Sequence, residues 1–114
     1  GPGKRPLHNM CPRVVTADRR PVLALGATGG RRIPNAVFDV LAYRVGAGLP
    51  LAEAVGAPRV HTEGDLALTL EAEWPRGVGD HFRAAGYEVR TGASANLNAI
   101  ARDPATGALT PAAR

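Results

Sequence analysis

A short strand, a glycine pair and a helix follow one another closely between residues 22 and 45. The run at 22–25 is rich in β-forming residues, and Gly29-Gly30 comes soon after it. Apolar residues then recur with a helical period at Ile33, Val37, Leu41 and Val45, with Phe38 and Val40 beside them. Pro34 suits the first turn of this helix, and Gly46-Ala47-Gly48 ends it. A helix that follows a strand so directly is expected to cover a sheet.

The glycine pair also suits an anion-binding turn. Backbone N–H groups at a helix start lack partners, and a glycine without Cβ lets a ligand approach the main chain. Tight turns use glycine for geometric reasons as well. The pair alone therefore does not distinguish a binding site from an ordinary turn.

The other segments alternate between strand and helix patterns. A β-hairpin is predicted from the runs at 14–17 and 22–25 around a turn at 18–21. Further elements are predicted as a helix at 50–55, a short strand ending at His61, a strand at 66–70, a helix at 76–85 with Gly86 as its C-cap, and strands at 87–90, 97–102 and 108–110. The core should take Leu66, Leu68 and Leu70 from the strand and Val78, Phe82 and Ala85 from the helix. This order predicts an α/β or α+β layer with helices over a sheet.

Composition limits both the core and the partners. The 114 residues suffice for one small domain or part of a larger one, and only 4% are aromatic, so the core must consist of Ala, Val, Leu and Ile. A net charge of +4 permits an acidic partner, but the arginines are scattered without an aromatic platform, which argues against nucleic-acid binding. The single cysteine excludes an internal disulfide and disfavours structural zinc. No apolar run approaches the roughly 18 residues of a membrane span.

Several separate motifs occur in one order along the chain. They are the Gly-Lys-Arg-Pro-Leu stretch at 3–7 with Met10 and Pro12, then Gly29-Gly30 with Arg32-Ile33, the stretches at 52–55 and 57–61, Ser94-Ala95-Asn96, and the turn at 103–107. In this order and spacing they resemble the C-terminal part of the small subunit of γ-glutamyltransferases (γ-glutamyltranspeptidases). The resemblance implies that residues 1–114 are a single partial domain of an αββα N-terminal-nucleophile hydrolase sandwich. It also implies a precursor that cuts itself to expose a catalytic threonine, which would lie upstream of Gly1.

The resemblance assigns roles to two pairs of residues. The main-chain N–H groups of Gly29 and Gly30 would form the oxyanion hole for acyl transfer. His8 and Asn9 stand where the family usually has two serines that bind the α-carboxylate of the γ-glutamyl group, so they would line the acyl pocket. Both are larger than serine and would shrink or reshape the pocket, which favours the alternative of a different donor. Cys11 replaces a third serine and is expected to be an inert thiol.

The remaining polar residues are expected to be structural. Arg32 and Arg59 match family positions, and Arg32 could either favour an anion or pair with an acid that fastens the turn. His61 and His81 are interpreted as ordinary structural or surface histidines. The acids Asp65, Glu71, Glu73 and Asp80 have no paired spacing that would indicate acid–base catalysis, and no metal site is predicted.

The sequence therefore predicts part of an enzyme that cleaves γ-glutamyl amides such as glutathione through a threonine acyl-enzyme and passes the acyl group to water or an amine. The alternatives are an acylase or other amidohydrolase of the same family with a different donor, and a non-catalytic fragment or paralogue that acts as a binding module. Expected partners are the large subunit, the N-terminal part of the small subunit and a small amide substrate, with no cofactor. The compartment stays open.

Overall fold

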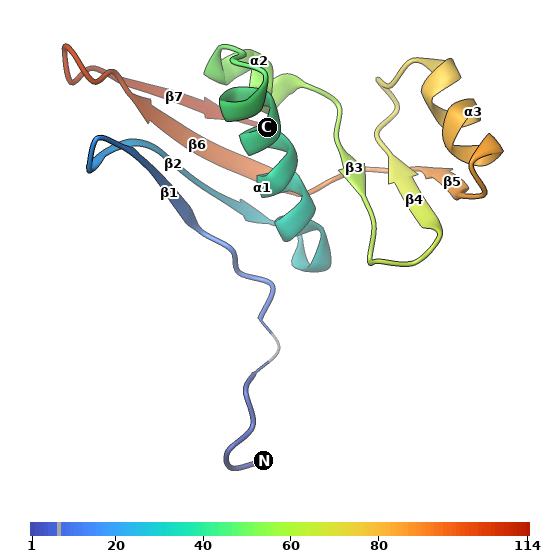
Figure 1. The fold of residues 1–114 in the computed structure, drawn as a ribbon. Helices are drawn as coiled ribbons and strands as arrows, with labels where there is room; N and C mark the ends of the chain where they lie inside the picture. Colours follow the sequence, from blue (N-terminus) through green and yellow to red (C-terminus); the bar gives the residue numbers. More distant parts are fainter. Residues whose placement is uncertain (7) are drawn as a thin grey trace.

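A larger and a smaller β-sheet lie side by side in the computed structural model, which describes residues 1–6 and 8–114 (Figure 1). The larger sheet is antiparallel, in the order β1-β2-β6-β7. Its strands are β1 (Arg13–Ala17), β2 (Arg20–Thr28), β6 (Asn96–Arg102) and β7 (Leu109–Ala113). The smaller sheet consists of β3 (Val60–His61), β4 (Ala67–Leu70) and β5 (Glu88–Thr91), with β3–β4 antiparallel and β4–β5 parallel.

The helices are divided between the two sheets. The 3-10 turn η1 (Gly30–Arg32) leads into α1 (Ile33–Leu41), which continues into the π-helical turn η2 (Ala42–Gly46) and is followed by α2 (Leu51–Gly56). Helices α1 and α2 cover one face of the larger sheet, while α3 (Arg76–Ala84) connects β4 to β5 beside the smaller sheet (Figure 1). Mixed sheets and helices in this arrangement confirm the predicted α+β class.

The core lies between α1, α2 and the central strands β2 and β6. It is built only from the four aliphatic residue types that the composition predicted: Leu23, Leu25, Ile33, Ala36, Val37, Val40, Leu51, Ala54, Val55, Ala95, Leu97 and Ala99. Leu97, Val40 and Val55 are its largest fully buried side chains. Within the described residues, no helix is long and apolar enough to cross a membrane.

The first hairpin turns more tightly than predicted. Strand β2 already begins at Arg20, so only Asp18 and Arg19 form the turn, with φ of 49° and 63°. Positive φ at both central residues is typical of a type I′ turn, which matches the twist of the flanking strands. The paired part of β2 is therefore longer than the predicted run at 22–25.

The predicted helix at 33–45 is correct in position but wrong in part of its buried face. Regular α-helix ends at Leu41, and the wider π turn then changes the spacing, so Val45 is not brought back to the core and is 62% exposed. Phe38 is likewise exposed, because Ile33, Val37 and Val40 already define the buried stripe.

Two further side chains that were predicted to face the core are exposed, and both lie just outside a strand or helix. Leu66 precedes β4 and is exposed, and Ala85 lies past the end of α3 and is exposed. The predicted C-cap is confirmed: Gly86, at φ +93°, donates to Arg83, and Tyr87 donates to the carbonyl of Phe82. These two bonds make a Schellman motif.

Candidate functional site

The Gly29-Gly30 turn lies where β2 gives way to η1 and α1. Thr28, the last residue of β2, pairs with Asn96 of β6, and Gly30 then takes a left-handed φ of +61°. The amide of Arg32 donates to the carbonyl of Gly29 at 3.3 Å. Within residues 1–6 and 8–114, no turn or loop hydrogen bond starts from the N–H of either glycine. As far as the described residues go, both groups are thus available to donate to an anion at the start of a helix, where the helix dipole also favours negative charge.

Gly29 and Gly30 differ in what surrounds them. A Cβ built on Gly29 would lie 2.7 Å from Cβ and 2.8 Å from Cα of Ala95, so no other residue fits there without a backbone shift. A Cβ on Gly30 would meet nothing within 4 Å among the described residues. Gly29 is therefore required by packing against Ala95, the residue before β6, and Gly30 by its left-handed backbone.

His8 lies at a hollow beside β2. This hollow has a volume of about 570 Å³ and is lined by His8, Met10, Cys11, Pro12, Gly26 and Ala27. The structure brings His8 together with the second half of β2, but it places neither Asn9, which is half-buried, nor the glycine pair in the lining. Cys11 is half-buried and packs against the core. Leu7, part of the predicted N-terminal motif, lies outside the described residues.

A buried ion pair was missed by the sequence interpretation. Arg59 is 2% and Glu71 is 7% exposed, and Nη2 of Arg59 lies 3.3 Å from Oε1 of Glu71. A second cation, Arg114, lies 3.1 Å from Oε2 of the same carboxylate. The spacing of the acids gave no sign of this pairing. The available signal was a charged residue directly after the half-buried strand that ends at Leu70.

The arginines beside the glycines have separate environments. Arg31 makes the ion pair of this turn, with Nη1 2.7 Å from Oε2 of Glu63. Arg32, for which the sequence allowed either such a pair or the binding of an anion, is exposed. His81 is exposed on α3 as expected, and His61 is buried, with Nε2 3.8 Å from Oε1 of Glu63.

One carboxyl group of α1 titrates near neutral pH. Burial raises the pKa of Asp39 to about 6, against the opposing effects of a hydrogen bond from the amide of Val60 and of the Arg59 charge. The hydrogen bond from Val60 to Oδ2 is 2.9 Å long. Asp39 therefore links α1 to the start of β3, and its charge state changes between pH 5 and 7.

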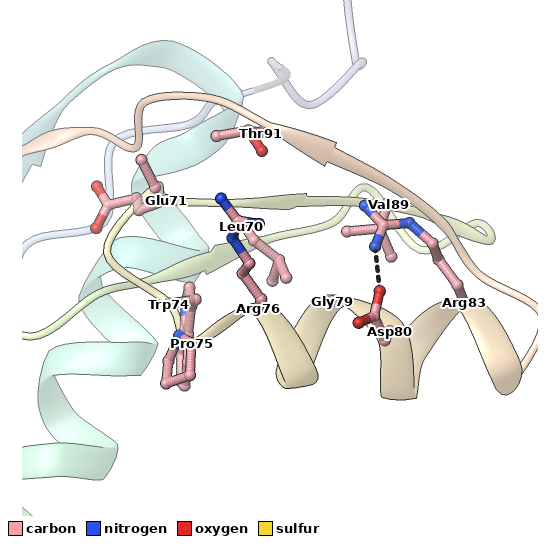
Figure 2. A pocket seen from close by; sticks show the side chains of 11 residues that line it. Leu70, Glu71, Trp74, Pro75, Arg76, Gly79, Asp80, Arg83, Val89 and Thr91 are labelled. Atoms are coloured by element: carbon pink, nitrogen blue, oxygen red, sulfur yellow. Dashed lines mark hydrogen bonds and ion pairs between the residues drawn. The ribbon is translucent and has the colours of Figure 1, made fainter.

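A second hollow, of about 540 Å³, separates α3 from strands β4 and β5 (Figure 2). The ion pair of Arg83 with Asp80, 2.9 Å long, spans part of it. Glu71 lies at one end of this hollow with its carboxylate directed away from α3 (Figure 2). None of the four predicted site residues lines it.

The comparisons with known proteins agree with the motifs of the sequence. A family model described as Gamma-glutamyltranspeptidase matches residues 1–113. The chain is 32% identical over 90 residues to a glutathione hydrolase proenzyme of Bacillus subtilis, a match that covers 79% of this chain and 15% of that protein. It is 37% identical over 114 residues to the Acylase ACY 1 proenzyme of Pseudomonas sp. (strain V22), which covers 98% of this chain and 20% of that protein.

The fold agrees as well. A structure of the γ-glutamyltranspeptidase from Pseudomonas nitroreducens, complexed with L-DON, superposes with a TM-score of 0.86 at 34% identity, over 99% of this chain and 61% of that one. The chain thus spans only a small part of its curated relatives, yet nearly all of it matches the family model. It belongs to the γ-glutamyltranspeptidase family.

Proposed function

We propose that this chain is the C-terminal portion of the small subunit of a γ-glutamyltransferase-like enzyme, which cleaves an amide through a threonine acyl-enzyme and transfers the acyl group to water or an amine. The observation that carries the proposal is the glycine turn, whose two N–H groups have no turn or loop acceptor within residues 1–6 and 8–114. The threonine would come from the part of the enzyme outside this chain.

The role of the turn in this chemistry is electrostatic. Attack of a threonine hydroxyl on an amide carbonyl forms a tetrahedral intermediate with a negatively charged oxygen, which needs positioned donors. The N–H groups of Gly29 and Gly30 would donate to that oxygen, and the start of η1 and α1 would add favourable partial charge. One such donor typically contributes about 10²–10³ in rate.

A second candidate concerns the acyl group. Among the described residues, the hollow beside β2 is lined mostly by apolar or small ones, with His8 as the one basic side chain. Such a lining favours an amide whose acyl group lacks the α-amino acid head of γ-glutamate, as an acylase would use. The 37% identity to the acylase proenzyme over 98% of this chain supports the same alternative.

The two donors are distinguished by replacing the residues that differ from the family pattern. The full-length protein is assayed with γ-glutamyl-p-nitroanilide and with glutaryl-p-nitroanilide, which lacks the α-amino group. If the pocket assignment is right, the variant His8→Ser/Asn9→Ser gains at least about tenfold in kcat/KM on the γ-glutamyl donor, because sites built to bind a polar group discriminate strongly. The control His81→Ser/Asn98→Ser carries the same exchanges at exposed positions and should leave both rates unchanged.

The acyl-enzyme mechanism is tested separately from the choice of donor. Incubation with either donor should give an acyl adduct on a processed chain that begins with threonine, visible by mass spectrometry. A full-length product without self-cleavage and without an adduct would refute the enzyme proposal in favour of the binding module. Equal gains in the test variant and its control would refute the roles of His8 and Asn9.

A further inference from the structure

The buried pair Arg59–Glu71 joins the two ends of a short β-hairpin. Arg59 precedes β3 and Glu71 follows β4, and the amide of Glu71 donates to the carbonyl of Arg59 at 3.2 Å. The bonds run in the other direction too, because the amide of Arg59 donates to Oε2 of Glu71 at 2.9 Å. Side chain and main chain of both residues are thereby fixed at the border of the smaller sheet.

The same two side chains hold the segment that crosses to the larger sheet. Nη1 of Arg59 donates to the carbonyl of Ala95 at 2.9 Å, and the amide of Ser94 donates to Oε1 of Glu71 at 3.2 Å. The two successive residues are therefore each held by one partner of the ion pair, Ser94 through its amide and Ala95 through its carbonyl. Residues 92–95 connect β5 with β6, as Figure 1 shows.

Ala95 is also the residue that limits the space at Gly29. The position of a Gly29 Cβ would be 2.7 Å from Cβ and 2.8 Å from Cα of Ala95, and Ala95 is 1% exposed. A shift of Ala95 is thus transmitted to the glycine turn, because Ala95 occupies the space in which a side chain of residue 29 would lie. A continuous chain of contacts leads from the ion pair to the turn.

We propose that Arg59 and Glu71 are positioning residues, which clamp Ser94 and Ala95 against Gly29 and so aim the N–H groups of the glycine turn. This inference rests on the proposed oxyanion role of that turn. A purely stabilising role is a weak explanation for the pair, because buried ion pairs are often replaceable by apolar residues without loss of stability. Hydrogen bonds directed at the segment that touches Gly29 explain why charged groups are placed here.

The test uses the full-length enzyme and removes both charges at once. In Arg59→Met/Glu71→Leu the apolar side chains replace the pair without leaving a lone buried charge, while the bonds to Ser94 and Ala95 are lost. Because misplacement by about 1 Å can cost 10²-fold, we expect kcat for the donor to fall roughly ten- to hundredfold with KM nearly unchanged. A boronic acid analogue of the donor, which mimics the tetrahedral intermediate, should lose affinity by the same factor.

Two further variants serve as a matched control and as a milder change of the ion pair. Arg83→Met/Asp80→Leu makes the same exchanges in an exposed ion pair and should keep kcat and the boronate affinity. Glu71→Gln retains one carbonyl oxygen and should show a smaller loss in kcat, again without a change in KM. Normal kcat and boronate affinity in the folded double variant would overturn the proposal, and so would unfolding of both test variants, which would assign the pair a structural role only.

The failure of this inference is distinct from that of the proposed function. If Gly29→Ala keeps wild-type turnover, the oxyanion role is wrong. If Gly29→Ala is impaired but Arg59→Met/Glu71→Leu is not, the oxyanion role stands and only the clamp is wrong.

Discussion

Replacement of Gly29 by alanine is the most direct test of the glycine turn. The new Cβ would lie 2.7 Å from Cβ and 2.8 Å from Cα of Ala95, whereas carbon atoms in contact prefer about 3.5–4.0 Å. Relief of this overlap therefore requires a movement of about 1 Å between the turn and Ala95, the residue before β6. Both partners are part of ordered backbone, so the movement displaces the N–H groups that would hold the oxyanion.

The size of the effect follows from that displacement. A misplacement of about 1 Å can lower the rate about 10²-fold, which corresponds to roughly 2.7 kcal/mol in the activation free energy. A single lost oxyanion donor costs a similar factor. We expect kcat of Gly29→Ala to fall about 10²-fold with little change in KM, since the donors act on the transition state and not on the bound substrate.

Steady-state kinetics of the full-length protein with the preferred nitroanilide donor measure this effect. The control is Gly77→Ala in α3, where a new Cβ meets no described residue within 4 Å and kcat should stay unchanged. The double variant Gly29→Ala/Ala95→Gly should recover only part of the loss, because Cα of residue 95 still lies 2.8 Å from the new methyl group. Wild-type kcat in soluble, folded Gly29→Ala would refute the reasoning.

Two predictions concern stability. The pKa of Asp39 is raised from 3.8 to about 6. The contribution of the protonated carboxyl group to the free energy of unfolding is therefore fully present below pH 4 and is lost as the pH rises through 6. Asp39→Asn keeps an acceptor for the amide of Val60 and should stabilise the fold at pH 8 by about 1–2 kcal/mol after solvent screening is allowed for; an equal gain in Tm at pH 4 would contradict this. Leu97→Ala, at a fully buried site of β6, should cost about 2–5 kcal/mol in urea unfolding, and a cost no larger than that of the partly exposed Ile100→Ala would contradict the assigned core.

Local patterns predicted most of the elements. Period-2 and helical spacings are written into neighbouring residues, so the strands, the helices and the aliphatic core were accessible from the sequence. The errors fall where the pattern of neighbouring residues does not reveal the backbone conformation. The π turn after Leu41 interrupts a repeat that looks regular as far as Val45, and the tight turn at Asp18 and Arg19 has none of the glycines that usually mark a type I′ hairpin.

For the same reason, only part of the candidate site could be predicted from the sequence. The glycine turn is contiguous in sequence and could be proposed from it, together with the stretch around His8, where the flanking residues match the family and His8 and Asn9 depart from it. The ion pair joins residues 59 and 71, and its side chains bind residues 94 and 95. Nothing in the spacing of these residues predicts their contact, because it depends on how the two sheets are joined.

The contact between Gly29 and Ala95 changes what a glycine pair at a helix start implies. Many turns of this kind leave N–H groups unpaired. The direction in which those N–H bonds point is fixed only where the surrounding backbone holds the turn in one position. Here the absence of a side chain at residue 29 lets Ala95, the residue before β6, approach to the limit of contact, and the bond from Arg59 holds Ala95 at that limit. A residue larger than alanine at 95 would push the turn away as surely as a side chain at 29 would. The close approach therefore requires a small residue at both places, glycine at 29 and alanine in the Ser94-Ala95-Asn96 motif.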